Sequence, residues 1–74
     1  MEIKVRLFAT LREGRGKELM ISLDDHPTTQ MIIDQLNIKK EDVAILLING
    51  RDGALDRVLE KTDVVSLFPP VGGG

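Results

Sequence analysis

The stretch EIKVRLF, residues 2–8, alternates between apolar and charged side chains. Ile3, Val5 and Leu7 share one parity, and such alternation is typical of a β-strand with one buried face. Phe8 falls in the other parity, with the charged residues. The chain is therefore expected to begin with a strand that turns an aliphatic face toward the core, and Phe8 is expected outside that inward register.

A second alternating stretch predicts a hairpin with this first strand. Leu19, Ile21 and Leu23 again share one parity, and Gly14-Arg15-Gly16 indicates a turn before them. The segment Asp24-Asp25-His26-Pro27 then interrupts the pattern, so the second strand is expected to end there.

A short helix is predicted next. Thr28 is a suitable N-cap, because its hydroxyl can accept a hydrogen bond from an N–H group of the first turn. Residues at i, i+3, i+4 and i+7 follow along one helical face: Thr29, Ile32, Ile33 and Leu36. The pattern supports a helix of at most about three turns.

The second half of the chain predicts two more strands. Val43–Ile48 is continuously apolar, so it is predicted to be a central strand that is covered on both faces. Asn49-Gly50 indicates a turn. Ala54–Lys61 is expected to form an irregular or briefly helical segment over the core, and Val64–Phe68 is the last strand.

This order of elements predicts an α+β domain with the helix against one face of a mixed sheet. We assign residues 1–68 to the domain and residues 69–74 to a flexible C-terminal tail. A chain of 74 residues buries only about 60% of the surface that it exposes when unfolded. It has no cysteine, so packed aliphatic side chains must supply its stability.

Composition excludes several classes of function. Without cysteine there is no thiol nucleophile, redox pair or thiolate metal site. The net charge of −2 comes from scattered charges, which argues against nucleic acid or an anionic membrane as partner. No apolar run approaches the length of a membrane span, and no secretory signal is apparent, so a cytoplasmic location is expected.

The motifs along the chain together resemble the MoaD/ThiS family of sulfur carriers, and most closely its MoaD branch, the small subunit of molybdopterin synthase. The match opens at Ile3–Glu13 and includes Ile48-Asn49-Gly50. Its specific part is the ending Phe-Pro-Pro-Val-Gly-Gly-Gly, residues 68–74. The resemblance implies a ubiquitin-like β-grasp fold, with one main helix on one face of a mixed sheet and a flexible C-terminal tail.

The resemblance also implies a function at Gly74. In this family an E1-like enzyme adenylates the C-terminal carboxylate with ATP, and a sulfur donor enzyme converts it to a thiocarboxylate. The thiocarboxylate then donates sulfur in molybdopterin (molybdenum or tungsten cofactor) biosynthesis, with the large synthase subunit as partner. The chain itself is expected to be a carrier and not an enzyme, with no bound cofactor and no metal.

The tail residues suit this role. Glycine makes a thin segment that can enter another protein's active site, which favours such use of Gly72, Gly73 and Gly74. Pro69-Pro70 favours a stiff, extended start, and the whole tail, with Val71, could span about 20 Å. A frayed glycine end without function is the plain alternative.

Phe8 and Phe68 are the only aromatic residues, and both lie at strand ends. They are candidates for a partner-docking surface, which the resemblance places on the sheet near the tail; the alternative is that they complete the core. Lys4, Arg6 and Arg51 could add charge at its rim, although solvated surface charge is the simpler interpretation.

Other candidate motifs are weak. His26 is expected to be an exposed loop residue, because a single histidine makes no metal site. Gly14-Arg15-Gly16-Lys17 lacks the spacing of a phosphate-binding loop. Two other functions stay open: a thiamine-type carrier or ubiquitin-like modifier that uses the same carboxylate, and a non-covalent β-grasp interaction module.

Overall fold

The computed structural model describes residues 1–70 of this protein. Their regular elements are β1 (Glu2–Leu7), η1 (Ala9–Arg12), β2 (Glu18–Ser22), α1 (Thr29–Gln35), η2 (Lys40–Asp42), β3 (Ile45–Ile48), β4 (Arg51–Asp52) and β5 (Val64–Phe68), where η marks a 3-10 turn. The predicted order of strands and helix is confirmed. The short strand β4 and the two 3-10 turns were not predicted from the sequence.

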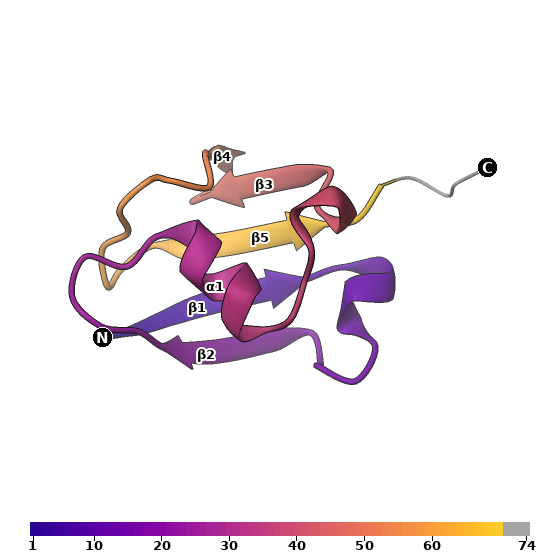
Figure 1. The fold of residues 1–74 in the computed structure, drawn as a ribbon, viewed down its shortest axis with the longest axis horizontal. Helices are drawn as coiled ribbons and strands as arrows, with labels where there is room; N and C mark the ends of the chain where they lie inside the picture. The colour runs from indigo at the N-terminus through magenta and orange to yellow at the C-terminus, as the bar shows by residue number, and fades with distance from the viewer. Residues whose placement is uncertain (71–74) are drawn as a thin grey trace.

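The strands form one mixed sheet in the order β2-β1-β5-β3-β4 (Figure 1). β1 and β2 are antiparallel, as the predicted hairpin requires, with Ile3 opposite Ile21. β5 lies between β1 and β3, parallel to the first and antiparallel to the second. The last strand of the chain is therefore the middle strand of the sheet.

The position predicted for Val43–Ile48 is wrong. Only Ile45–Ile48 form the strand β3, and its outer neighbour is the two-residue strand β4. Ile48 is buried, whereas Ile45 is 47% exposed. The apolar run indicated a strand covered on both faces, but here the second apolar face remains on the surface.

Helix α1 is short because both of its ends are specified by side chains or backbone conformation. The Thr28 hydroxyl accepts a hydrogen bond from the Met31 N–H, which confirms the predicted N-cap. Asn37 adopts a left-handed conformation, with φ of 59°, and the Ile38 N–H then reaches back to the Ile33 carbonyl at 2.8 Å. This is a common way to end a helix. It leaves a helix of seven residues, shorter than the three-turn limit.

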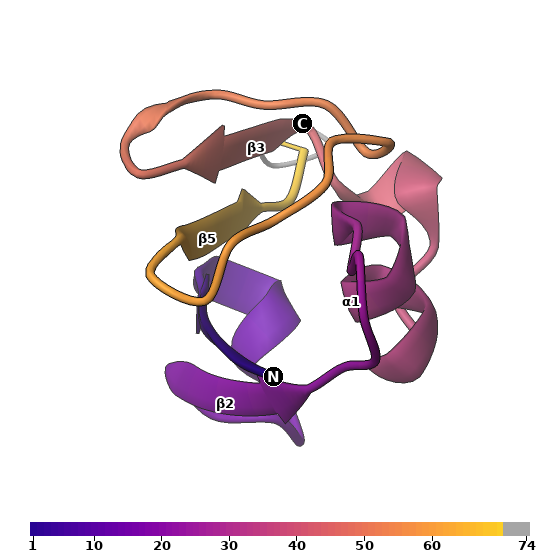
Figure 2. The same cartoon turned by 90° about the vertical axis from the view of Figure 1, so that its left-hand side faces the viewer.

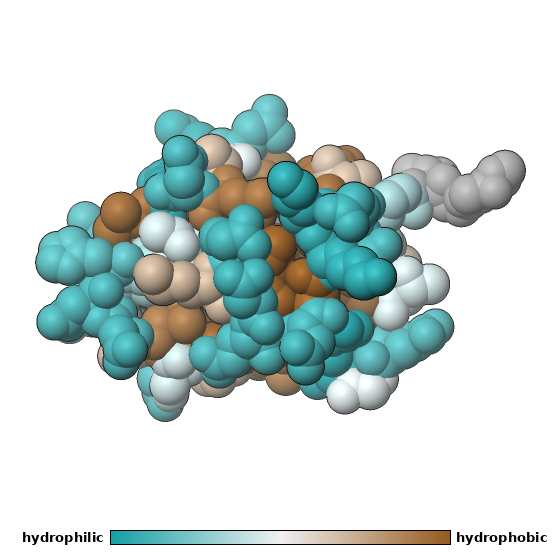
Figure 3. All heavy atoms as spheres, in the orientation of Figure 1, coloured by the Kyte–Doolittle hydropathy of each residue, from teal (hydrophilic) through white to brown (hydrophobic). Residues whose placement is uncertain are grey.

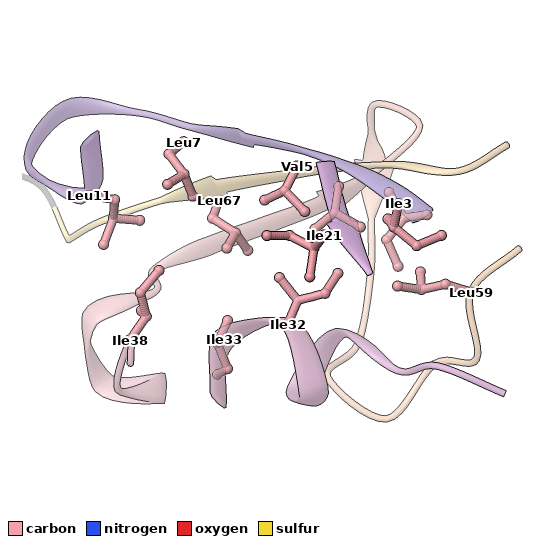
Figure 4. Close-up of a cluster of buried hydrophobic side chains, with 12 residues drawn as sticks. Ile3, Val5, Leu7, Leu11, Ile21, Ile32, Ile33, Ile38, Leu59 and Leu67 are labelled. Atoms are coloured by element: carbon pink, nitrogen blue, oxygen red, sulfur yellow. The ribbon is translucent and has the colours of Figure 1, made fainter. Parts of the chain in front are cut away.

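The core lies between α1 and one face of the sheet, and Figure 2 shows the helix on that side alone. Its buried hydrophobic side chains form one aliphatic cluster (Figure 4): Ile3, Val5, Leu7, Leu11, Ile21, Ile32, Ile33, Ile38, Ile48, Leu59, Val65 and Leu67. The inward register predicted for the first two strands is thus confirmed. Neither phenylalanine belongs to the buried core.

The segment between β4 and β5 is irregular, as expected, and Leu59 anchors it in the core. Together these elements make the ubiquitin-like β-grasp fold, an α+β arrangement with one main helix on one face of a mixed sheet. The predictions for Val71, Gly72, Gly73 and Gly74 fall outside the described residues. Within residues 1–70, no helix is long and apolar enough to cross a membrane.

Candidate functional site

The middle strand β5 leads directly to the tail. It pairs with β1 on one side and with β3 on the other, and the carbonyl of its last residue, Phe68, accepts a hydrogen bond from the Ala44 N–H at 2.8 Å. Pro69, the next residue, is half-buried, and Pro70 is exposed. β5 ends at the opposite end of the molecule from the N terminus (Figure 1). Pro69 and Pro70, the first residues of the tail, therefore follow β5 at the end of the sheet that lies opposite the N terminus (Figure 1).

Phe8 and Phe68 are brought together by the parallel pairing of β1 with β5. Leu7 lies opposite Leu67 in that ladder, so Phe8 and Phe68, the residues that follow them, lie side by side. The two rings stack with centroids 4.1 Å apart and planes within 8°. Both side chains are half-buried and lie on the outer face of the sheet, away from α1. The prediction that Phe8 lies outside the inward register is confirmed.

Arg12 packs against the Phe8 ring of this pair, and its contact was not predicted from the sequence. The 3-10 turn η1 folds the chain back after Phe8, and the Arg12 Nε donates a hydrogen bond to the Leu7 carbonyl at 2.7 Å. Its guanidinium carbon lies 5.2 Å from the centre of the Phe8 ring, a cation–π distance. The i, i+4 spacing of Phe8 and Arg12 could have indicated this contact, had the segment been recognised as a helical turn.

The apolar surface extends from the stacked rings onto β3. Ile45 lies opposite Phe68 in the β3–β5 ladder, and Leu47 lies opposite Ser66. We call Phe8, Ile45, Leu47 and Phe68 the outer patch. It lies on the face without a helix, opposite the face seen in Figure 3, where hydrophilic residues cover much of the helix side. Ile45 and Leu47 were not predicted at this surface, because their strand was expected to be covered on both faces.

Charged residues on β1 and β2 flank the outer patch. Glu18 pairs with Arg6 at 3.3 Å and with Lys4 at 3.9 Å, and all three side chains are about half exposed. Exposed pairs of this kind contribute little to stability, because water and salt screen them. Arg51 lies on β4 and is exposed. Two of the three predicted rim charges are therefore already paired within the chain.

Arg15 connects the 3-10 turn η1 to the end of helix α1. Its Nε donates to the Leu36 carbonyl at the end of α1, and its Nη1 donates to the Leu11 carbonyl, both at 3.2 Å. Arg15 also shares a shallow cleft with Asp42, Pro69 and Pro70. Gly14 and Gly16 have positive φ, so the segment Gly14–Lys17 serves the turn that the sequence predicted.

No cluster of three or more His, Cys, Asp or Glu side chains occurs in the part of the chain that the structure describes. His26 lies in an exposed bend with φ of 56°, as expected of a loop residue. The main feature of the outer face is the outer patch, which lies beside Pro69 at the start of the tail.

Comparison with known proteins agrees with this geometry. The ThiS family matches residues 5–74 of the chain. Small archaeal modifier protein 3 of Haloferax volcanii is 33% identical over 92 aligned residues, which cover both chains in full. A solved structure described as molybdopterin converting factor subunit 1 from Pyrococcus furiosus has a TM-score of 0.80 at 29% identity and covers 96% of this chain and 99% of its own.

A further structure is a complex of subunits 1 and 2 of the molybdopterin-converting factor of Helicobacter pylori. Its matching chain is 27% identical, with both chains covered in full and a TM-score of 0.63. In that protein, a chain of this fold assembles with a second subunit.

Proposed function

This chain belongs to the ThiS family, and on that premise we propose that it is a sulfur carrier whose reactive group is the Gly74 carboxylate. The proposal rests on one observation: the start of the tail and the outer patch lie side by side, where β5 ends. The middle strand β5 is followed in sequence by Pro-Pro-Val-Gly-Gly-Gly, and it ends beside the outer patch, with its stacked aromatic rings, exposed Ile45 and half-buried Leu47. A carrier needs this pair of features, a docking surface and a terminus that can enter a partner's active site.

The proposed chemistry takes place in the partner enzymes. A Gly74 carboxylate oxygen attacks the α-phosphate of ATP, and pyrophosphate leaves, so that the carboxylate becomes an acyl-adenylate. A donor enzyme's persulfide sulfur then attacks the acyl carbon and displaces AMP, and reductive cleavage of the resulting acyl disulfide by a thiol of the donor system leaves the thiocarboxylate. ATP is thus a substrate of the E1-like partner, and the carrier needs no bound cofactor of its own.

The outer patch is the proposed contact for both partners. Phe68 and Phe8 offer a flat aromatic surface, and the hydrogen bond to Leu7 holds Arg12 against it. Aromatic and arginine side chains commonly dominate the energy of protein interfaces. Because the outer patch adjoins Pro69, a partner that covers it would have the terminus within reach.

The proposed pathway is molybdopterin synthesis. Two structurally similar proteins carry names from that pathway, and one of them is bound to its second subunit. We therefore propose that the large synthase subunit receives the loaded tail and that sulfur passes from Gly74 to the pterin precursor. A thiamine-type carrier would use the same group on a different acceptor.

A second candidate function is protein modification. The relative from Haloferax volcanii with 33% identity is a small archaeal modifier protein. In this function, a lysine amine of a target protein would attack the activated Gly74 carbonyl, and an amide would replace the thiocarboxylate. Conjugates of higher mass that contain this chain in its native host would favour this second function. A non-covalent module would need neither activation nor a free terminus.

The first experiment measures ATP–pyrophosphate exchange by the cognate adenylating enzyme. The full chain is expected to support exchange, whereas a variant that ends at Gly72 is expected to fold normally and to support none. The isolated chain, without the enzyme, serves as the blank. Equal exchange with the shortened variant would remove Gly74 from the mechanism.

A further inference from the structure

The sheet has two open edges, and they differ in how well they are protected. β4 forms one edge and consists of two charged residues, Arg51 and Asp52. β2 forms the other edge and has five residues (Figure 1). Its one charged side chain, Glu18, is already paired with Arg6 and Lys4. Natural proteins usually protect such edges with charges, proline or bulges, because an open strand can pair with another chain.

The ladder between β1 and β2 identifies which backbone groups of β2 are unpaired at the edge. On either side of β2, the Leu7 N–H donates to the Lys17 carbonyl and the Leu23 N–H donates to the Met1 carbonyl. In an antiparallel pair the bonded positions alternate, so Leu19 and Ile21 also face β1. The N–H and C=O groups of Glu18, Met20 and Ser22 therefore point away from the sheet.

We propose that β2 pairs in antiparallel fashion with β2 of a second copy of this chain, with the two Met20 residues opposite each other on a two-fold axis. In this register Glu18 lies opposite Ser22 of the second copy. All outward N–H and C=O groups of the three residues then find a partner, and the two five-stranded sheets become continuous.

The side chains agree with this register. On the outer face, the two Met20 side chains meet; each is 54% exposed in the single chain. On the helix side, Leu19 comes beside Ile21 of the second copy, so the facing pairs are apolar. No like charges stand opposite each other between the two strands, which would be unfavourable.

Charges beyond the strand ends are complementary as well. Exposed Lys17 precedes β2, and exposed Asp24 and Asp25 follow it closely. Antiparallel pairing brings the basic end of one strand toward the acidic end of the other, twice by symmetry. This charge distribution favours a second copy in antiparallel orientation over a parallel arrangement.

This pairing is independent of the proposed carrier function. The outer patch lies on β3 and at the ends of β1 and β5, away from the β2 edge, and the two-fold axis makes the two β5 strands run in opposite directions. The contact involves two five-residue strands, so it falls in the class of small interfaces, below about 1,200 Å², that are transient.

The test measures self-association over a wide range of protein concentration. In sedimentation equilibrium the weight-average mass is expected to rise from that of one 8.2 kDa chain toward that of two. In two-dimensional amide spectra over the same range, the concentration-dependent shifts are expected at Glu18, Met20 and Ser22. A chain that stays monomeric at millimolar concentration would overturn the proposal, as would shifts centred on Phe8 and Phe68.

A charge substitution at the two-fold axis sharpens the test. Met20→Glu places a carboxylate opposite Lys4 within the chain and should keep the fold, but it sets two carboxylates against each other across the axis. The dimer is expected to weaken by at least about tenfold. Met31→Glu, at an exposed methionine on α1, makes the same change in charge and should leave association unaltered. Equal effects of the two variants would refute the assigned surface, and both proteins should still support pyrophosphate exchange.

Discussion

At the scale of single residues, Asp63 is a buried acid whose hydrogen bonds stabilise one end of the sheet. It is 7% exposed. Its Oδ2 accepts from the Glu60 N–H at 2.9 Å, and its Oδ1 accepts from the Asn49 Nδ2 at 2.8 Å. The Asn49 Oδ1 in turn accepts from the Val64 N–H, so the acid joins the β3–β4 turn to the start of β5.

These contacts predict a pH dependence of stability. The hydrogen bond from the Glu60 N–H is the main cause that lowers the pKa of Asp63 below its ordinary value; Asn49 and nearby Arg57 act in the same direction, while burial opposes them. A lowered native pKa means that the stabilisation is present above the ordinary pKa. It is lost as the pH falls from about 5 through the native pKa. Urea unfolding between pH 7 and pH 2 measures this loss.

Asp63→Asn provides the matching variant. An amide cannot accept at both positions, so one partly buried N–H donor loses its partner, and the free energy of unfolding at pH 7 should fall by about 1 kcal/mol. The variant should also lose part of the acid-dependent destabilisation. Asp56→Asn, at an exposed aspartate, is the control. An unchanged acid profile in Asp63→Asn would contradict the role assigned to this carboxylate.

Thr29 is the second informative residue, because its buried hydroxyl has no hydrogen-bond partner within residues 1–70. A buried, unpaired hydroxyl costs free energy that a methyl group does not. Thr29→Val should therefore leave stability unchanged or raise it by about 1 kcal/mol, equivalent to roughly 4–8 °C in melting temperature for a small domain.

The neighbouring threonine supplies a control of opposite sign. Thr28→Val removes the N-cap of α1 and should lower stability by about 1 kcal/mol. Both variants are compared by thermal unfolding under the same conditions. A loss in Thr29→Val as large as that in Thr28→Val would show that the Thr29 hydroxyl does have a stabilising partner.

At the scale of elements, the parallel pairing of β1 with β5 creates the outer patch. Phe8 and Phe68 are 60 positions apart in the sequence, and only this pairing stacks them. The alternation in residues 2–8 could predict the face on which Phe8 lies. It could not predict the stack, because strand order depends on long-range packing that local periodicity does not encode.

The same limit explains the error at β3. Continuous apolarity is shared by a strand covered on both faces and by a strand whose second face binds a partner. In the structure the second face of β3 lies on the surface, since Ile45 is exposed and Leu47 is half-buried. The start of the helix, in contrast, depends on the neighbouring residue Thr28, and the sequence predicted it correctly.

The outer patch predicts an effect of Phe68→Ala. Loss of the ring should weaken binding to the adenylating enzyme by about 2 kcal/mol. The fold should lose less, because an aromatic pair contributes about 0.5–1.5 kcal/mol beyond area burial and Phe68 lies outside the core. Calorimetric titration and melting curves measure the two effects separately.

Met31→Ala is the control for this prediction, because Met31 is exposed on α1, on the other side of the sheet. Its affinity for the enzyme should equal that of the wild type. If Phe68→Ala unfolds the domain while the affinity of the folded fraction is unchanged, Phe68 supports the fold and does not bind the partner.

At the scale of the whole molecule, stability and proposed reactivity are separated along the chain. The core and the sheet lie within residues 1–68, and the proposed reactive carboxylate lies at Gly74. The motif that ends the chain indicated this division from the sequence alone, whereas the contacts of Arg12 and Asp63 emerged only from the fold. The assignment of residues 69–74 to a tail and the cytoplasmic location remain predictions.

The most direct test of the carrier proposal is the yield of thiocarboxylate, measured by intact mass spectrometry after incubation with ATP, the cognate adenylating enzyme and the sulfur donor. We compare the wild type with a variant that carries one alanine after Gly74. The addition moves the carboxylate by roughly 3.5 Å, and misplacing a reacting group by about 1 Å can already cost a hundredfold in rate. The wild type is expected to gain the mass difference of sulfur for oxygen, while the extended chain keeps its melting curve and gains none. Normal loading of the extended chain, with its alanine still in place, would contradict the carrier function.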